Sequence, residues 1–166
     1  MEFRNFREIP IFSTLTDDEL VLVKDITRER LFNKGDMIMH EGEEGDTMYL
    51  VVDGIVEVSK SLTMRFGEDD FRKREKVLTR FRPEDHVVFG EMALIARDTR
   101  SATIVAVSDC RLIEIGREGF LGLVEKAPTL GVKVLFKISE LLISRLRQSG
   151  QDVIRLTTAL SIALSK

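Results

Sequence analysis

Residues 89–103, FGEMALIARDTRSAT, carry the densest chemical pattern in this sequence. Phe89 ends a short apolar run, Gly90 can adopt backbone angles closed to other residues, and the next residues fit one or two helical turns. The first amides of such a helix lack carbonyl partners, so the turn favours an anion. The segment therefore predicts a strand, a glycine turn, a short helix and a loop, where a ligand can approach the main chain closely.

The charged side chains of this segment suit a sugar phosphate. Arg100 offers a planar fork of donors that matches two phosphate oxygens, and Ser101 adds a hydroxyl donor beside it. Glu91 would repel a phosphate that it faced, so its useful role is to accept hydrogen bonds from ligand hydroxyls. An anion together with hydroxyls indicates a nucleotide. Spacing alone also allows a purely structural interpretation, in which Gly90 only turns the chain and Glu91 and Arg100 form a salt bridge.

The surrounding region, from Leu31 to Ile115, has the texture of short strands closed by glycine or acidic turn residues. Asp53-Gly54 lies between two of these strands and predicts a type I′ hairpin turn, with positive φ at both central positions. The mixed-charge stretch Glu68–Lys76 predicts a solvated hairpin tip. Strands that follow one another without helices favour an antiparallel roll or barrel. Strands are expected within residues 37–39, 48–52, 55–58, 77–78, 87–89, 102–107 and 111–115.

Helices are expected on both sides of this region. Thr16 and Glu19 have the spacing of a capping box, so a helix should start there and end at the polar stretch Thr27–Arg30. A long helix should follow Pro128, and Gly150 leaves open whether that helix is continuous. Its apolar rows can pack on the roll, on a second copy of the helix, or on both. The rows contain Leu135, Ile138, Leu142, Leu146, Ser149, Val153, Leu156, Leu160 and Ala163.

Composition limits the class of protein. The chain has 166 residues, with 25 Lys and Arg against 28 Asp and Glu, so its net charge is −3 and one ordinary core is expected. Cys110 is the only cysteine, which excludes an intramolecular disulfide and a CxxC pair. No apolar signal core is present, and no apolar run approaches the roughly 20 residues that cross a bilayer. We therefore expect a cytoplasmic protein without membrane contact.

The segment 89–103 resembles the phosphate-binding cassette of cyclic nucleotide-binding domains, the family of the catabolite activator protein and the regulatory subunits of cyclic-AMP-dependent kinase. The resemblance covers roughly Ile9 to Leu146. It implies a mainly β fold with flanking helices (α+β), an antiparallel β-roll of the double-stranded jelly-roll type with an N-terminal helix and a long C-terminal helix. Further matching pieces are Ile9-Pro10-Ile11-Phe12, Gly35-Asp36, Glu41-Gly42, Gly45-Asp46 and Tyr49-Leu50-Val51-Val52-Asp53-Gly54.

The resemblance also implies the ligand, cyclic AMP or cyclic GMP, with no other cofactor and no metal. It implies that Glu91 binds the ribose 2′-hydroxyl and Arg100 the cyclic phosphate. Base preference stays open, because Ser101 is compatible with either purine. The capping residue is expected from the long helix or a partner subunit, with Arg145 and Arg147 as contacts to consider. The other residues expected to line the pocket are Gly90, Met92, Ala93, Ser101 and Ala102.

The sequence argues against two further functions, that of an enzyme and that of a DNA-binding protein. His40 and His86 are the only histidines and lack metal-ligand spacing, so we expect no enzyme and no metal site. A DNA-binding module would have to follow the long helix, and this sequence ends at Lys166, so no nucleic-acid partner is expected.

Two functional interpretations remain. The first is a regulatory module whose β-roll with its N-terminal helix, residues 1–127, binds the nucleotide. In it, the helix of residues 128–166 acts as a lid, dimerises in parallel and signals to an unknown downstream protein. The alternative is a ligand-free dimerisation scaffold of the same fold. Residues 128–166 carry six basic and two acidic residues, a surplus of +4. That surplus allows an acidic partner or an ordinary solvated helix face.

Overall fold

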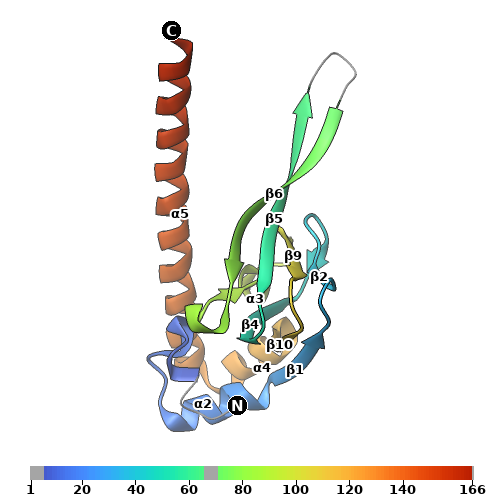
Figure 1. The fold of residues 1–166 in the computed structure, drawn as a ribbon. Helices are drawn as coiled ribbons and strands as arrows, with labels where there is room; N and C mark the ends of the chain where they lie inside the picture. Colours follow the sequence, from blue (N-terminus) through green and yellow to red (C-terminus); the bar gives the residue numbers. More distant parts are fainter. Residues whose placement is uncertain (1–5, 66–70, 166) are drawn as a thin grey trace.

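The computed structural model describes residues 6–65 and 71–165, which form two antiparallel sheets with helices at both ends of the chain (Figure 1). One sheet has the strand order β1-β10-β4-β7, the other β2-β9-β5-β6, and β3 pairs with β8 in a small ribbon. This arrangement confirms the predicted mainly β roll. The strands are β1 (Thr27–Phe32), β2 (Met37–Met39), β3 (Glu44–Gly45), β4 (Thr47–Asp53), β5 (Val56–Arg65), β6 (Phe71–Phe81), β7 (Val88–Phe89), β8 (Asp98–Thr99), β9 (Thr103–Ala106) and β10 (Cys110–Gly116).

The helices begin and end close to where the sequence predicts. Thr16 and Glu19 form the predicted capping box, because the Glu19 carboxylate accepts from the Thr16 amide at 2.8 Å and the Thr16 hydroxyl accepts from the Glu19 amide at 3.3 Å. The helix from Pro128 runs unbroken through Gly150 to Leu164. The helical elements are η1 (Pro10–Phe12), α2 (Asp17–Asp25), η2 (Pro83–Asp85), α3 (Met92–Ile95), α4 (Arg117–Lys126) and α5 (Pro128–Leu164).

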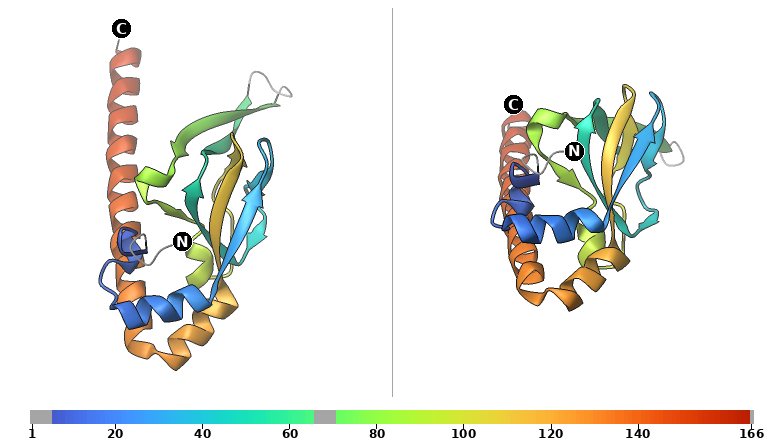
Figure 2. Two further views of the ribbon diagram at one scale, coloured as in Figure 1. Left: turned by 60° about the horizontal axis from the view of Figure 1, so that its bottom comes forward. Right: turned by 90° about the horizontal axis from the view of Figure 1, so that it is seen from below.

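Strand β4 contributes side chains to two hydrophobic cores, because its side chains alternate between its two faces. Met48 and Leu50 belong to a buried cluster that contains residues of α2, α4 and α5. Tyr49 and Val51 belong to a second cluster, enclosed between the two sheets. Figure 2 shows α2, α4 and the first turns of α5 together on one side of the roll. The helices therefore cover one face of this sheet, and the interior of the roll is left for the pocket.

The predicted hairpin at Asp53-Gly54 is wrong. Strand β4 pairs with β10 and β7, whereas β5 pairs with β9 and β6, so this turn carries the chain from one sheet to the other. Gly54 has φ +84°, but His86 is the only non-glycine residue with positive φ in the described part of the chain, which excludes a type I′ turn. A Cβ at Gly54 would also lie 2.7 Å from the Cys110 sulfur, so close packing requires glycine here.

Helix α2 ends at Asp25, just before the polar stretch Thr27–Arg30 as expected, but strand β1, which begins there, was not among the predicted strands. Residues 27–32 form an edge strand that pairs with β10 along its whole length. Four of its six residues are exposed, so the strand lacks the apolar alternation from which strands are predicted. Cross-strand ion pairs add to its backbone pairing, Arg30 with Glu114 at 3.6 Å and Glu29 with Arg111 at 3.7 Å.

Strands β5 and β6 form a long antiparallel pair that projects beyond the roll (Figure 1). The predicted hairpin tip, Glu68–Lys76, lies partly outside the described residues, since 66–70 are not among them. Residues 71–76 belong to β6 and pair with β5. Within residues 6–65 and 71–165, no helix is both long and apolar enough to span a bilayer.

Candidate functional site

The site is built around the turn that leaves β7. Gly90 has φ +75° and directs the chain from the edge of the sheet into α3. A Cβ at this position would lie 2.6 Å from the Met39 methyl and 2.7 Å from the Thr47 carbonyl oxygen. Glycine is therefore required both by the backbone angle and by the close packing. Two of the first amides of α3 are already bonded, Ala93 to the Gly90 carbonyl and Leu94 to the Glu91 carbonyl, both at 3.1 Å.

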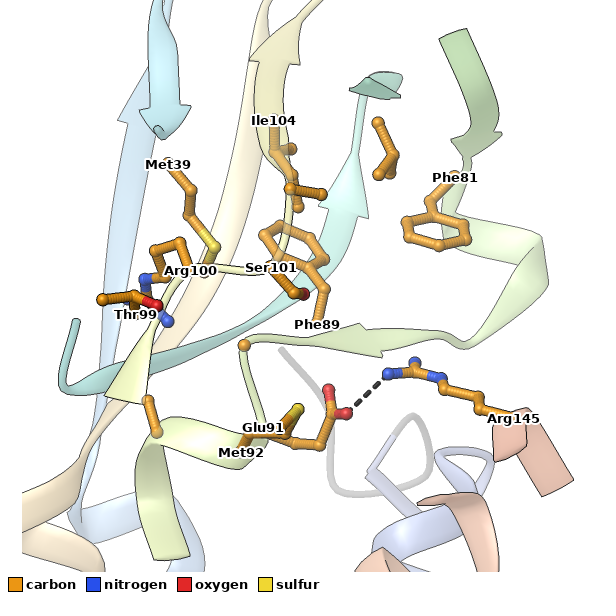
Figure 3. A pocket seen from close by; sticks show the side chains of 14 residues that line it. Met39, Phe81, Phe89, Glu91, Met92, Thr99, Arg100, Ser101, Ile104 and Arg145 are labelled. Atoms are coloured by element: carbon orange, nitrogen blue, oxygen red, sulfur yellow. Dashed lines mark hydrogen bonds and ion pairs between the residues drawn. The ribbon is translucent and has the colours of Figure 1, made fainter. Parts of the chain in front are cut away.

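All seven residues predicted to bind the nucleotide line one pocket. Its volume is about 690 Å³ when the open space at its mouth is included. The pocket lies between the cassette, the interior of the roll and α5 (Figure 3). The predicted residues found there are Gly90, Glu91, Met92, Ala93, Arg100, Ser101 and Ala102, and the others are Met39, Val58, Phe81, Phe89, Thr99, Ile104 and Arg145. Their role in binding a nucleotide stays a prediction.

Glu91 is the polar group buried deepest in this pocket, with 2% of its surface exposed. Its Oε1 accepts from Nη1 of Arg145 at 2.5 Å, and Nη2 of Arg145 donates to the Val88 carbonyl at 3.0 Å. Oε2 of Glu91 is buried and has no hydrogen-bond partner among the described residues. A buried carboxylate oxygen without a donor is costly, so this atom marks a place where a ligand hydroxyl would be stabilising.

Arg100 is held by Thr47 and does not contact Glu91. Its Nη1 donates to the Thr47 carbonyl and its Nη2 to Oγ1 of Thr47, both at 2.8 Å. Burial lowers the pKa of the Arg100 guanidinium, whereas electrostatic attraction to Tyr49 and to the Asp46 carboxylate acts in the opposite direction. Arginine stays protonated in proteins, so the pocket holds a positive charge that is partly withdrawn from water.

The structural interpretation that paired Glu91 with Arg100 is wrong, since the partner of Glu91 is Arg145. Figure 3 shows Arg145 pointing from α5 toward Glu91, with Arg100 lying away from both. Sequence reasoning named Arg145 only as a contact to consider, and it missed Thr47 altogether. No local pattern signals either role, because the Arg145–Glu91 bond spans 54 positions of sequence and the Arg100–Thr47 bonds span 53.

Aromatic rings form one wall of the pocket. Phe89 stacks on Phe81 with ring centroids 6.3 Å apart and an interplanar angle of 20°, and on Tyr49 at 5.7 Å. Burial raises the pKa of the Tyr49 phenol, and its hydrogen bond to Glu114 at 2.8 Å acts in the same direction. The wall is thus apolar, and a flat heterocycle would fit against it.

Cys110 and the possible metal ligands were the other reactive side chains that the sequence offered. Cys110 is buried, and its thiol lies within hydrogen-bonding distance of the Ile55 and Ser108 carbonyls, at 3.3 and 3.2 Å. In the part of the chain that the structure describes, no three His, Cys, Asp or Glu residues are grouped so that they could hold a metal ion.

The chain belongs to the cyclic nucleotide-binding domain family, whose model matches residues 29–127. It is 31% identical over 144 residues to the cyclic AMP receptor protein of Thermus thermophilus, covering 87% of this chain and 60% of that protein. It is 35% identical over 121 residues to the mouse cGMP-dependent protein kinase 2, covering 72% of this chain and 15% of the kinase. This chain thus spans 60% or less of the length of these two relatives.

Solved structures agree with this assignment. The catabolite activator protein of Thermus thermophilus superposes with a TM-score of 0.73 at 30% identity, covering 89% of this chain and 63% of that one. The regulatory domain of Toxoplasma gondii PKA, solved with cAMP, gives a TM-score of 0.59 at 29% identity, covering 76% of this chain and 44% of that one. A cyclic nucleotide-binding domain from Methylobacillus flagellatus, at 23% identity, has the same fold with a TM-score of 0.75, covering 92% and 82%.

Proposed function

We propose that this chain binds cyclic AMP or cyclic GMP as a regulatory module and transmits binding through α5 to a partner protein. In this proposal Arg100 binds the cyclic phosphate and Glu91 accepts a hydrogen bond from a ribose hydroxyl. The other five residues shape the pocket through their backbone or small side chains, and they are Gly90, Met92, Ala93, Ser101 and Ala102.

One observation carries the proposal: a guanidinium and a carboxylate face the same pocket without neutralising each other. Glu91 is held by Arg145 and Arg100 by Thr47, so both charged groups are fixed in place. Oε2 of Glu91 still lacks a donor among residues 6–65 and 71–165. A ligand with both an anion and a hydroxyl would satisfy the two groups at once, which a purely structural ion pair would not require.

The aromatic wall supports a purine as the third part of the ligand. Phe81 and Phe89 present stacked rings beside the pocket, and Ile104 adds an aliphatic surface. None of these side chains can read the hydrogen-bonding edge of a base, so cyclic AMP and cyclic GMP remain equally compatible.

The contact between Arg145 and Glu91 supports transmission through α5. Arg145 lies on α5 and bonds to the carboxylate proposed to bind ribose, so a ligand hydroxyl at Glu91 would change the surroundings of this helix directly. A ligand shifts a conformational equilibrium only if it binds one state better than the other. The Arg145–Glu91 bond is the interaction through which the two states can differ in affinity.

We also propose that α5 forms a parallel homodimer. The predicted apolar rows divide in the structure: Ile138 is buried and Leu135 and Leu142 are partly buried against the first core. A second row, which shares Leu146, Val153 and Leu160 with the predicted one, is exposed along the whole helix at alternating steps of four and three, the spacing of a two-stranded coiled coil. This exposed row, here called the α5 seam, contains Val132, Phe136, Ser139, Ile143, Leu146, Gly150, Val153, Thr157, Leu160 and Leu164.

Sedimentation tests the dimer. A change of Val153, 60% exposed on the α5 seam, to glutamate should shift the protein toward the monomer, because two carboxylates would then face each other. The matched control is Ile162→Glu, since Ile162 is 61% exposed on the opposite side of the helix. A native protein that sediments as a monomer at micromolar concentration would exclude the dimer.

Calorimetry with cyclic AMP and cyclic GMP tests nucleotide binding. Each charge-assisted hydrogen bond contributes about 1.5–3 kcal/mol, so Arg100→Leu should weaken binding at least about tenfold. Arg97→Leu is the control, because Arg97 lies on the same segment and carries the same charge but does not line the pocket. Equal affinity of the native and Arg100→Leu proteins would exclude this site. Failure of the native protein to bind either nucleotide would favour the ligand-free dimerisation scaffold.

A further inference from the structure

The guanidinium of Arg100 makes both of its hydrogen bonds with one residue, Thr47 on strand β4. Both terminal nitrogens donate to Thr47, one to its carbonyl and one to its hydroxyl, each at 2.8 Å. Two bonds from the two ends of a planar group fix the plane as well as the position of that group. The direction from which an anion can form bidentate hydrogen bonds is then fixed too.

Two glycines pack against the same guanidinium from different segments. Gly45 on β3 lies outside the left-handed region of φ, so its backbone does not require glycine. A Cβ there would overlap Nε and Cζ of Arg100. A Cβ on Gly90 would lie 2.8 Å from Nη1 of Arg100. Gly45 and Gly90 therefore leave a slot that fits the guanidinium and would be closed by any larger residue.

The main chain of Arg100 is tied to the same stretch of sequence. Its amide donates to the Glu43 carbonyl at 2.7 Å, and its carbonyl accepts from the Gly42 amide at 2.9 Å. Strand β8, just before Arg100, pairs with β3. Residues 42–47 thus hold both the backbone and the side chain of this arginine.

We propose that Thr47 is a positioning residue for Arg100, fixing through its hydroxyl and carbonyl the orientation in which the guanidinium meets the ligand phosphate, while Gly45 keeps the slot open. This inference rests on the proposed nucleotide binding. Thr47 and Gly45 should therefore affect the affinity for the cyclic nucleotide indirectly, through the orientation of Arg100.

Two substitutions at Thr47 separate the hydroxyl from the rest of the side chain. Thr47→Val keeps the size and branching but removes the hydroxyl, and it should weaken cyclic nucleotide binding about three- to tenfold, the equivalent of one hydrogen bond. Thr47→Ser keeps the hydroxyl and should stay within about twofold of the native affinity. The matched control is Thr158→Val, the same change on the exposed part of α5.

Nitrogen-15 NMR of the arginine side chains tests the same contact without ligand. The Nη signals of Arg100, assigned by their loss in Arg100→Leu, should be resolved in the native protein and in Thr47→Ser. They should be averaged by rotation in Thr47→Val and in Gly45→Ala. Gly122→Ala should leave them resolved, because no atom lies within 4 Å of a Cβ at Gly122.

The outcomes distinguish this inference from the proposed function. If the native protein binds a nucleotide and Thr47→Val binds it equally well, with unchanged Nη signals, Thr47 does not position Arg100. If the native protein binds neither nucleotide, the proposed function fails. The NMR comparison of Thr47→Val with Thr47→Ser then decides by itself whether Thr47 orients the guanidinium.

Discussion

Replacing Arg145 with methionine should destabilise the fold through the carboxylate that it leaves behind. The change keeps much of the apolar stem of the side chain and removes the donors to Glu91 and to the Val88 carbonyl. Glu91 would then be a buried charge without any partner. Its alternatives are to take up a proton or to draw water into the pocket, and both reduce the free energy of unfolding.

The size of this effect follows from the exposure of the two side chains. Removing one partner of a fully buried ion pair costs about 3–5 kcal/mol, whereas an exposed pair contributes about 0.2–1 kcal/mol. The side chain of Glu91 is 2% exposed and that of Arg145 is 42% exposed. The pair lies between these limits, so Arg145→Met should lower the free energy of unfolding by about 1–3 kcal/mol.

Urea unfolding of four proteins measures the interaction: the native chain, Arg145→Met, Glu91→Gln and the double variant. The double variant should lose less unfolding free energy than the two single variants together, because a glutamine at position 91 leaves no unpaired buried charge. Arg147→Met is the matched control, an exposed arginine two positions along the same helix. An Arg145→Met protein within about 0.3 kcal/mol of native stability, less than the usual error of additivity, would refute the reasoning.

Three further predictions concern α5 and its contacts. The hydrogen bond from Lys133 is the largest of the effects that lower the pKa of Glu19, so this interaction stabilises the fold above the ordinary glutamate pKa of 4.5 and is lost as the pH falls through the lowered value. The difference in unfolding free energy between native and Lys133→Met, about 1 kcal/mol near neutral pH, should therefore shrink in acid and should not grow. Gly150→Ala should raise the thermal midpoint through a gain of about 0.5–1 kcal/mol, because Gly150 lies inside a continuous helix with no atom within 4 Å of its new Cβ; a lower midpoint would contradict this. Ile138→Ala should cost about 2–5 kcal/mol in urea unfolding because Ile138 is fully buried, and a loss below about 1 kcal/mol would show that the first turns of α5 pack loosely.

Much of the fold follows from local patterns in the sequence. The apolar run Met48–Val52 predicts a strand, and the Thr16–Glu19 pair predicts a helix start, because both signals depend on neighbouring residues alone. The turn at Asp53-Gly54 was misinterpreted for a physical reason. An Asp-Gly pair in a sequence indicates a turn. Which sheet the next strand joins depends on contacts with strands far along the chain.

The site divides in the same way. Seven pocket residues were identified because they lie within one short segment, where the chemistry of each side chain can be read directly. Arg145 and Thr47, which hydrogen-bond the two charged groups, come from other elements, and only the folded chain brings them together with the cassette. Edge strand β1 was not predicted, because charged residues that pair with β10 stand where alternating apolar residues would indicate a strand.

The unbroken course of α5 through Gly150 would let this helix act as a lever arm in the proposed transmission. Its 37 residues, at 1.5 Å per residue, give a rod of about 55 Å, most of which stands clear of the roll (Figure 1). Tilting such a rod by about 10° at its first turns would sweep its far end through about 10 Å. Arg145 lies about 26 Å along α5 from its first residue, so a shift of about 1 Å where it meets Glu91 would move the far end of the helix by about 2 Å.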